Sequence, residues 1–133
     1  MTSTGIGDVA EEVGMAASAI RYYEEIGLLG DVPRVGGRRR FDRALVRRLR
    51  LIRLLTDTGF SLDEARLLVS DRSPGREDSR ELGRRKLTEI AAAMERLQMT
   101  RAVVEWGMRC RCPTFGDCTC EIHEMTPTSL PVR

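Results

Sequence analysis

The chain has 133 residues, of which 32% are charged and 5% are aromatic, and its formal net charge is +2. Charges interrupt every apolar run, so no stretch approaches the ~18 apolar residues of a membrane span, and we expect no membrane partner. The start, MTSTGIGDVAEEVG, lacks the basic and apolar regions of a secretory signal. This start predicts a cytoplasmic protein with reduced thiols.

Two short helices are predicted near the start of the chain. Apolar residues in the segment 6–13 recur at spacings that place them on one helical face, and Gly14 ends the pattern. A second helix is expected over about 16–25. Two short helices around a glycine-containing turn are typical of a helix-turn-helix.

The segment 32–41, VPRVGGRRRF, predicts a small hairpin, or wing, because two glycines stand between β-branched and basic residues. From Arg34 to Arg53 the chain carries nine arginines and one acid, Asp42, which gives a local charge of +8. Such a basic stripe predicts contacts with a phosphate backbone.

Three more helical segments are predicted after the wing. The first ends at Gly59, and the second begins at Ser61 with a capping box completed by Glu64. The third, 77–106, would be roughly 45 Å long and carries a heptad seam formed by Leu87, Ile90, Met94, Leu97 and Val104. A helix of this length predicts a homodimer that buries the seam, and the alternative is a helix folded back on its own N-terminal domain.

The expected fold is mainly α, with four regions. We predict a winged helix-turn-helix domain over 1–75, a dimerisation helix over 76–109 whose heptad seam ends at Gly107, a cysteine-rich sensor loop over 110–124, and a flexible tail over 125–133. The last assignment rests on two prolines and on the lack of periodicity in this segment.

Four motifs occur in order: IGDVA at 6–10, IRYYEEIGL at 20–28, RRF at 39–41 and GFSL at 59–62. Together they resemble the winged-helix domain of MerR-family transcription regulators, and the long helix extends the resemblance to about residue 106. The resemblance implies an antiparallel coiled-coil dimer that binds double-stranded promoter DNA and distorts it for RNA polymerase.

The DNA contacts are predicted to come from the second helix and the wing. Small residues at the start of that helix can approach bases, and arginine or tyrosine can donate to phosphates. The predicted contact residues are Ala17, Ser18, Arg21, Tyr22, Arg38, Arg39 and Arg40. Tyr23 is instead predicted to be a core residue, because it lies three residues from both Ile20 and Ile26.

All four cysteines lie in the stretch CRCPTFGDCTC, as Cys110, Cys112, Cys118 and Cys120. Disulfides within C-x-C pairs are disfavoured by geometry and by a reducing compartment. Four thiolates suit structural Zn²⁺, Cu(I) binding or a [2Fe-2S] cluster, and spacing alone does not choose among them. His123 is an alternative ligand. Trp106 and Phe115 are predicted to pack this loop against the partner subunit.

The family resemblance favours the cluster. The SoxR branch has the motif C-x2-C-x-C-x5-C, and Cys110, Cys112 and Cys118 fall on its last three cysteines. Gly107 takes the place of the first, so Cys120 is the expected substitute. This implies a redox-sensing activator with a [2Fe-2S] cluster. A Cu(I)- or zinc-responsive regulator stays open, since two C-x7-C pairs are also present. An enzyme is not expected, because the sequence has no glycine-rich phosphate loop or acid-base constellation.

Overall fold

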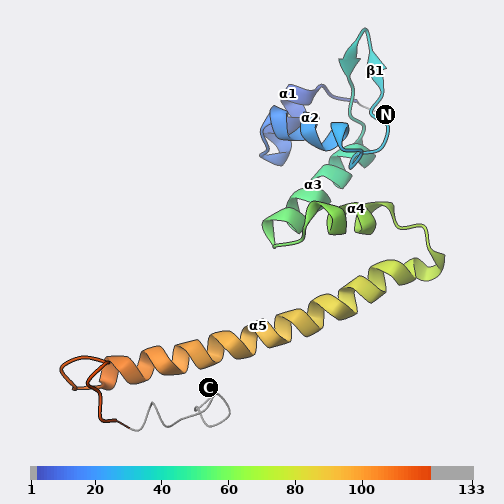
Figure 1. The fold of residues 1–133 in the computed structure, drawn as a ribbon. Helices are drawn as coiled ribbons and strands as arrows, with labels where there is room; N and C mark the ends of the chain where they lie inside the picture. The colour runs from blue at the N-terminus through green and yellow to red at the C-terminus, as the bar shows by residue number, and fades with distance from the viewer. Residues whose placement is uncertain (1–2, 121–133) are drawn as a thin grey trace. The chain divides into compact units, whose positions relative to one another are not determined.

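The computed structural model describes residues 3–120 and divides into two units, one ending at Arg80 and one beginning at Glu81. Figure 1 shows the elements in chain order, and the fold is mainly helical, as predicted. The elements are α1 (Ile6–Val13), α2 (Ala17–Glu25), β1 (Arg34–Val35), β2 (Arg38–Arg39), α3 (Arg43–Asp57), α4 (Leu62–Ser70), the 3₁₀ turn η1 (Pro74–Arg76) and α5 (Glu77–Arg109). Within 3–120, none of the helices has the length and apolar character needed to cross a membrane.

The hydrophobic core of the first unit is built by α1 to α4 and the segments that join them. Its largest fully buried side chains include Phe41, which follows the wing, and Ile20 of α2. Tyr23 packs against this core, whereas Tyr22 is 48% exposed. The prediction that Tyr23 is a core residue is therefore confirmed, and Tyr22 remains accessible to a partner.

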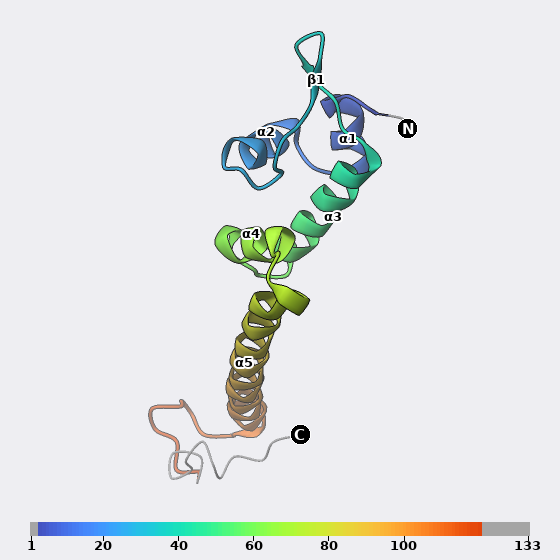
Figure 2. The ribbon, with the colours of Figure 1, turned by 90° about the vertical axis from the view of Figure 1, so that its right-hand side faces the viewer.

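The predicted wing is present as the antiparallel pair β1 and β2, in which Arg34 pairs with Arg39 and Val35 with Arg38. Gly36 and Gly37 form its two-residue turn with φ of 59° and 77°. Side chains disfavour these left-handed conformations, so the glycine pair specifies the tight hairpin. The hairpin projects beyond the neighbouring helices of its unit in both views (Figures 1 and 2).

Side-chain caps fix the starts of α3 and α4. Asp42 accepts a hydrogen bond from the backbone N–H of Leu45 at 2.8 Å. Ser61 and Glu64 form the predicted capping box, in which each side chain accepts from the other's backbone N–H. Because such caps satisfy otherwise unpaired amides at a helix start, they define where these two helices begin.

A carboxylate organises the turn between α4 and α5. Asp71 accepts hydrogen bonds from the backbone N–H of Ser73 at 2.8 Å and of Ser79 at 3.0 Å. The hydroxyls of both serines also donate to it. These bonds, those from Ser73 first, hold the pKa of Asp71 well below its usual range. The carboxylate is thus kept ionised at the junction.

The last helix, α5, has 33 residues and is about 50 Å long. Its seam residues Leu87, Ile90, Met94, Leu97 and Val104 are 50–68% exposed. The helix continues through Gly107 to Arg109, slightly beyond the predicted end at about residue 106. A single glycine costs a helix only about 1 kcal/mol relative to alanine, which the flanking helix formers tolerate.

Candidate nucleic-acid interface and metal centre

A basic concavity of about 430 Å³ lies between the start of α1, α2 and the wing. Its lining residues are Gly5, Ile6, Gly7, Asp8, Arg21, Gly37, Arg38, Arg39 and Arg40. Gly5 caps α1 without a side-chain hydrogen bond, so the first backbone N–H groups of the helix face outward at its positive end. The structure thus brings four of the seven predicted DNA contacts together in one site suited to a phosphate.

Glu24 of α2 ties the wing to the helix. Its carboxylate pairs with Arg34, at 3.2 Å, and with the guanidinium of Arg39. Arg39 is therefore already engaged within the protein. Arg40 donates to the carbonyl of Ser3 at 2.8 Å, while Arg38 is exposed at the tip. Sequence reasoning missed this clamp because its partners are ten to fifteen residues apart, beyond any local helical pattern.

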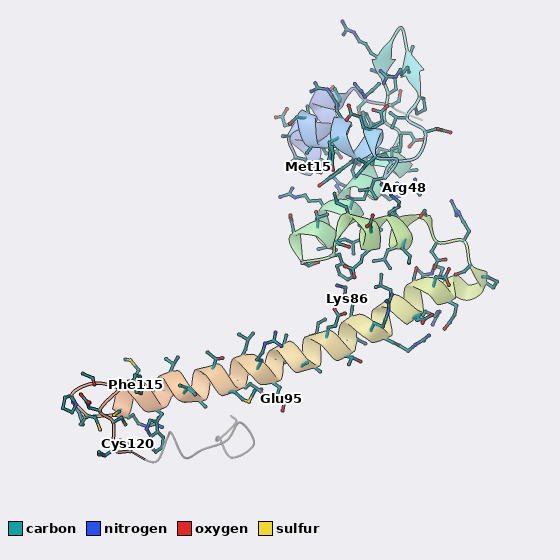
Figure 3. The ribbon with its side chains drawn as sticks, in the orientation of Figure 1. Met15, Arg48, Lys86, Glu95, Phe115 and Cys120 are labelled. Atoms are coloured by element: carbon teal, nitrogen blue, oxygen red, sulfur yellow. The ribbon has the colours of Figure 1, made fainter. Side chains whose placement is uncertain are left out.

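The basic stripe is less available to DNA than its charge suggests. Glu12 accepts from Arg43 at 2.8 Å and from Arg50 at 3.0 Å, and the hydrogen bond from Arg43 is the main cause that lowers the pKa of Glu12. Arg48 donates to the carbonyls of Leu29 and Val69 (Figure 3). At least these three arginines hold the fold together, so the whole stripe is not one phosphate-binding face.

The other three predicted contacts lie on α2 outside the lining of the concavity. Ala17 and Ser18 occupy the first turn of α2, where Ala17 is half-buried and Ser18 is exposed. Tyr22 is exposed next to Arg21. The first turn of this helix therefore offers small side chains and an open backbone to an approaching base edge.

The four cysteines converge after the end of α5. Their Sγ atoms all lie within 4.8 Å of one another. Cys110 Sγ is 3.6 Å from Cys118 Sγ and 3.7 Å from Cys120 Sγ, and Cys112 Sγ is 3.7 Å from Cys120 Sγ. All four side chains are half-buried and unpaired by disulfides. His123 and the rest of 121–124 lie outside the described residues.

The crowding of these thiols changes their acidity. The backbone N–H of Thr119, with hydrogen bonds from the neighbouring thiols, lowers the pKa of Cys112 to about 6. Hydrogen bonds with the neighbouring thiols, that of Cys118 first, raise the pKa of Cys120 to about 12. Adjacent thiolates repel one another, so each further ionisation of the four thiols costs more free energy than the last. A bound cation removes this cost.

The distances between the sulfurs can be compared with those around a zinc ion and around a [2Fe-2S] cluster. For a Zn–S bond of about 2.3 Å, the edge of the tetrahedron of sulfurs is about 3.8 Å, which matches the three short separations. In a [2Fe-2S] cluster, thiolates on different irons are separated by the iron-sulfide core, roughly 5 Å or more. Three of the six separations thus match a single tetrahedral ion, and the four cysteines lie close enough together to hold a metal ion or a cluster.

Aromatic and basic residues surround the thiols. A pocket of about 360 Å³ is lined by Trp106, Arg109, Cys110, Arg111 and Cys120. The guanidinium of Arg109 lies 6.0 Å from the centre of the Trp106 ring. Trp106 Nε1 is buried and has no hydrogen-bond partner within residues 3–120. Four thiolates around a divalent ion would carry two negative charges, which Arg109 and Arg111 would offset.

The loop that carries the last two cysteines turns back onto α5. Thr114 Oγ1 donates to Asp117 Oδ2 and accepts from the Asp117 backbone N–H, both at 3.1 Å. The Cys118 N–H donates to the Phe115 carbonyl at 3.2 Å. The Phe115 ring lies against Gly107 of the same chain, and Figure 3 shows Phe115 and Cys120 in this loop. The predicted packing of Phe115 against a partner subunit remains a prediction.

The first unit has the architecture of a winged helix-turn-helix DNA-binding protein. Residues 5–72 match the family described as MerR HTH family regulatory protein, and residues 46–106 match the one described as MerR, DNA binding. The chain belongs to the MerR family of transcription regulators. This membership confirms the resemblance and the prediction that the chain is a regulator and not an enzyme.

Similar proteins match from half to most of this chain. The HTH-type transcriptional regulator HmrR of Rhizobium leguminosarum bv. viciae is 33% identical over 103 residues, which cover 75% of this chain and 80% of that protein. A transcriptional activator SoxR homolog of Chromobacterium violaceum is 39% identical over 66 residues, 50% of this chain and 45% of that protein. The solved structure of PbrR691 from Ralstonia metallidurans CH34, in complex with lead(II), matches with a TM-score of 0.65 and 25% identity, covering 86% of this chain and 94% of that one.

Proposed function

We propose that this protein is a homodimeric, cytoplasmic transcription regulator that binds double-stranded promoter DNA and responds to one thiophilic metal ion of tetrahedral preference, represented by Zn²⁺. The observation that carries the metal assignment is the convergence of four Sγ atoms within 4.8 Å. Cys110, Cys112, Cys118 and Cys120 would hold the ion, which would pin the loop to the end of α5.

Two further observations support a metal ion. Four thiolates account for all the cysteines, whereas a two-coordinate Cu(I) site leaves two unexplained. The match to PbrR691, whose structure contains lead(II), covers 86% of this chain and therefore extends into the cysteine segment. That protein's metal is thiophilic, in keeping with a thiolate site at this position.

A redox-sensing [2Fe-2S] activator is the second candidate. The spacing of Cys110, Cys112 and Cys118 supports it, since these residues follow the SoxR motif. The SoxR homolog alignment, however, spans half of this chain, and the sulfur separations suit a single ion. The cluster interpretation therefore rests on the sequence spacing of the cysteines, and the ion interpretation rests on the positions of their sulfurs.

Metal analysis of anaerobically purified full-length protein decides between the two. We expect a colourless protein with about one zinc per chain and four thiols that react only after chelation. Replacement by Co²⁺ should give the visible bands of tetrahedral thiolate coordination. Brown protein with two irons and two sulfides per chain would establish the cluster in place of the single ion.

The regulatory part of the proposal requires a second assay. DNA distortion of the kind this family uses costs of order 1 to 6 kcal/mol, so the metal must bias two protein states by a comparable amount. In vitro transcription by RNA polymerase should differ at least about tenfold between metal-loaded and metal-free dimer. Equal transcription in both states would reduce the ion to a structural role.

The concavity between α1, α2 and the wing is the proposed phosphate site, and Arg38→Ala tests it. Arg38 is exposed at the wing, so its loss should weaken binding to all DNA sequences and lower the salt slope by about 1. Arg50→Ala is the matched control, because Arg50 is paired with Glu12. An unchanged salt slope in Arg38→Ala would remove the wing tip from the interface.

A further inference from the structure

The ring of Phe115 occupies the space that a side chain at position 107 would need. A Cβ built on Gly107 would lie 2.3 Å from Cζ and 2.8 Å from Cε2 of Phe115. Side-chain atoms do not approach this closely, so a residue larger than glycine and the present position of the ring exclude each other. The position of the Phe115 ring therefore explains why residue 107 is a glycine. The helical conformation of this residue does not by itself require one.

Gly107 and Phe115 each lie three residues before a candidate metal ligand, Cys110 and Cys118. The backbone N–H of Cys110 donates to the Trp106 carbonyl at 2.9 Å, which places the first thiol one turn beyond the glycine. On the loop side, the Phe115 carbonyl accepts from the Cys118 N–H. The ring on Gly107 thus joins the end of α5 to the part of the loop that carries Cys118, whose sulfur lies 3.6 Å from that of Cys110.

We propose that the packing of the Phe115 ring against Gly107 is the contact that holds the four thiols together as one site. This inference rests on the proposed function, because it concerns the same metal site. The contact brings Cys118 and Cys120 back to Cys110 and Cys112, and it fills position 107 so that no ligand can be offered from there. Phe115 is 63% exposed, so the closure depends on this one packed edge of the ring.

A double-mutant cycle tests the contact. The Co²⁺ and Zn²⁺ affinities of full-length wild type, Gly107→Ala, Phe115→Ala and the double variant are measured by chelator competition. Each single variant should bind metal about tenfold more weakly, as is usual when a supporting residue is lost. The double variant should be no weaker than Phe115→Ala alone, since the added methyl group then meets no ring.

Gly83→Ala is the matched control in the same helix, because a Cβ there would meet nothing within 4 Å. It should retain wild-type affinity. The emission of Trp106, the chain's one tryptophan, provides a second readout beside the pocket. It should shift in Gly107→Ala and not in Gly83→Ala, while α5 stays helical in both by circular dichroism.

Two results would overturn the inference. Wild-type affinity in Gly107→Ala would show that the ring moves aside without consequence for the site. Additive losses in the double variant would show that the two residues act separately. Failure of the proposed function has a different signature: wild-type protein would bind no Zn²⁺ or Co²⁺, and its four thiols would react freely, which would overturn both proposals.

Discussion

Cys120→Ser is expected to abolish stable metal binding. Cys120 Sγ lies 3.7 Å from the sulfurs of both Cys110 and Cys112, so it would complete the proposed set of four ligands. A serine hydroxyl stays protonated near neutral pH and is a poor ligand for a thiophilic ion. The loss in affinity should exceed about a hundredfold, beyond that for a supporting residue. The metal-to-protein ratio after desalting against a chelator measures it.

The same variant separates the sensor from the rest of the molecule. Dimerisation and non-specific DNA binding should be retained, because the core of the first unit and the seam of α5 do not involve Cys120. Thr119→Ser is the matched control, since the backbone of residue 119 is unchanged. Full metal occupancy in Cys120→Ser would place the fourth ligand elsewhere, with His123 the first alternative.

The local elements of the fold were predictable because local chemistry specifies them. The glycine pair at 36–37 requires left-handed backbone and thereby defines the wing turn. Ser61 and Glu64 satisfy each other's backbone amides within one helical turn. Apolar periodicity identified the helices, since it records which face is buried. Each of these signals lies within a few residues of the feature that it determines.

The roles of individual arginines were not predictable, because their partners are distant in sequence. Glu12 binds Arg43 and Arg50 from more than thirty residues away, and Glu24 binds Arg39 across the wing. A count of local charge cannot distinguish a guanidinium that meets DNA from one that holds two helices together. Only the tertiary fold separates Arg38 from these paired residues.

The cysteine segment shows the same limit within a single motif. Spacing identified all four candidate ligands, but it gave no distance between sulfurs of different C-x-C pairs. That distance depends on how the intervening residues fold back. In the structure, the folded-back loop places Phe115 against Gly107. The choice between one ion and a two-iron core is thus a question of loop geometry that the order of residues leaves open.

Leu97→Asp is expected to convert the dimer to monomers. Leu97 is 67% exposed in the single chain and lies in the apolar seam of α5, so pairing of two such seams would bury it. An unpaired carboxylate in a buried interface costs about 3 kcal/mol or more, and each dimer would contain two. The dimer dissociation constant should rise at least about a hundredfold, as measured by sedimentation equilibrium.

Ala92→Asp is the matched control, because it adds the same charge to an exposed position of α5 opposite the seam. It should stay dimeric. In Leu97→Asp, the affinity for a palindromic operator should fall far more than the affinity of a single half-site, since only the dimer presents two recognition helices at a fixed spacing. A Leu97→Asp protein that sediments as a dimer would place the interface elsewhere and would leave the exposed seam to a different partner.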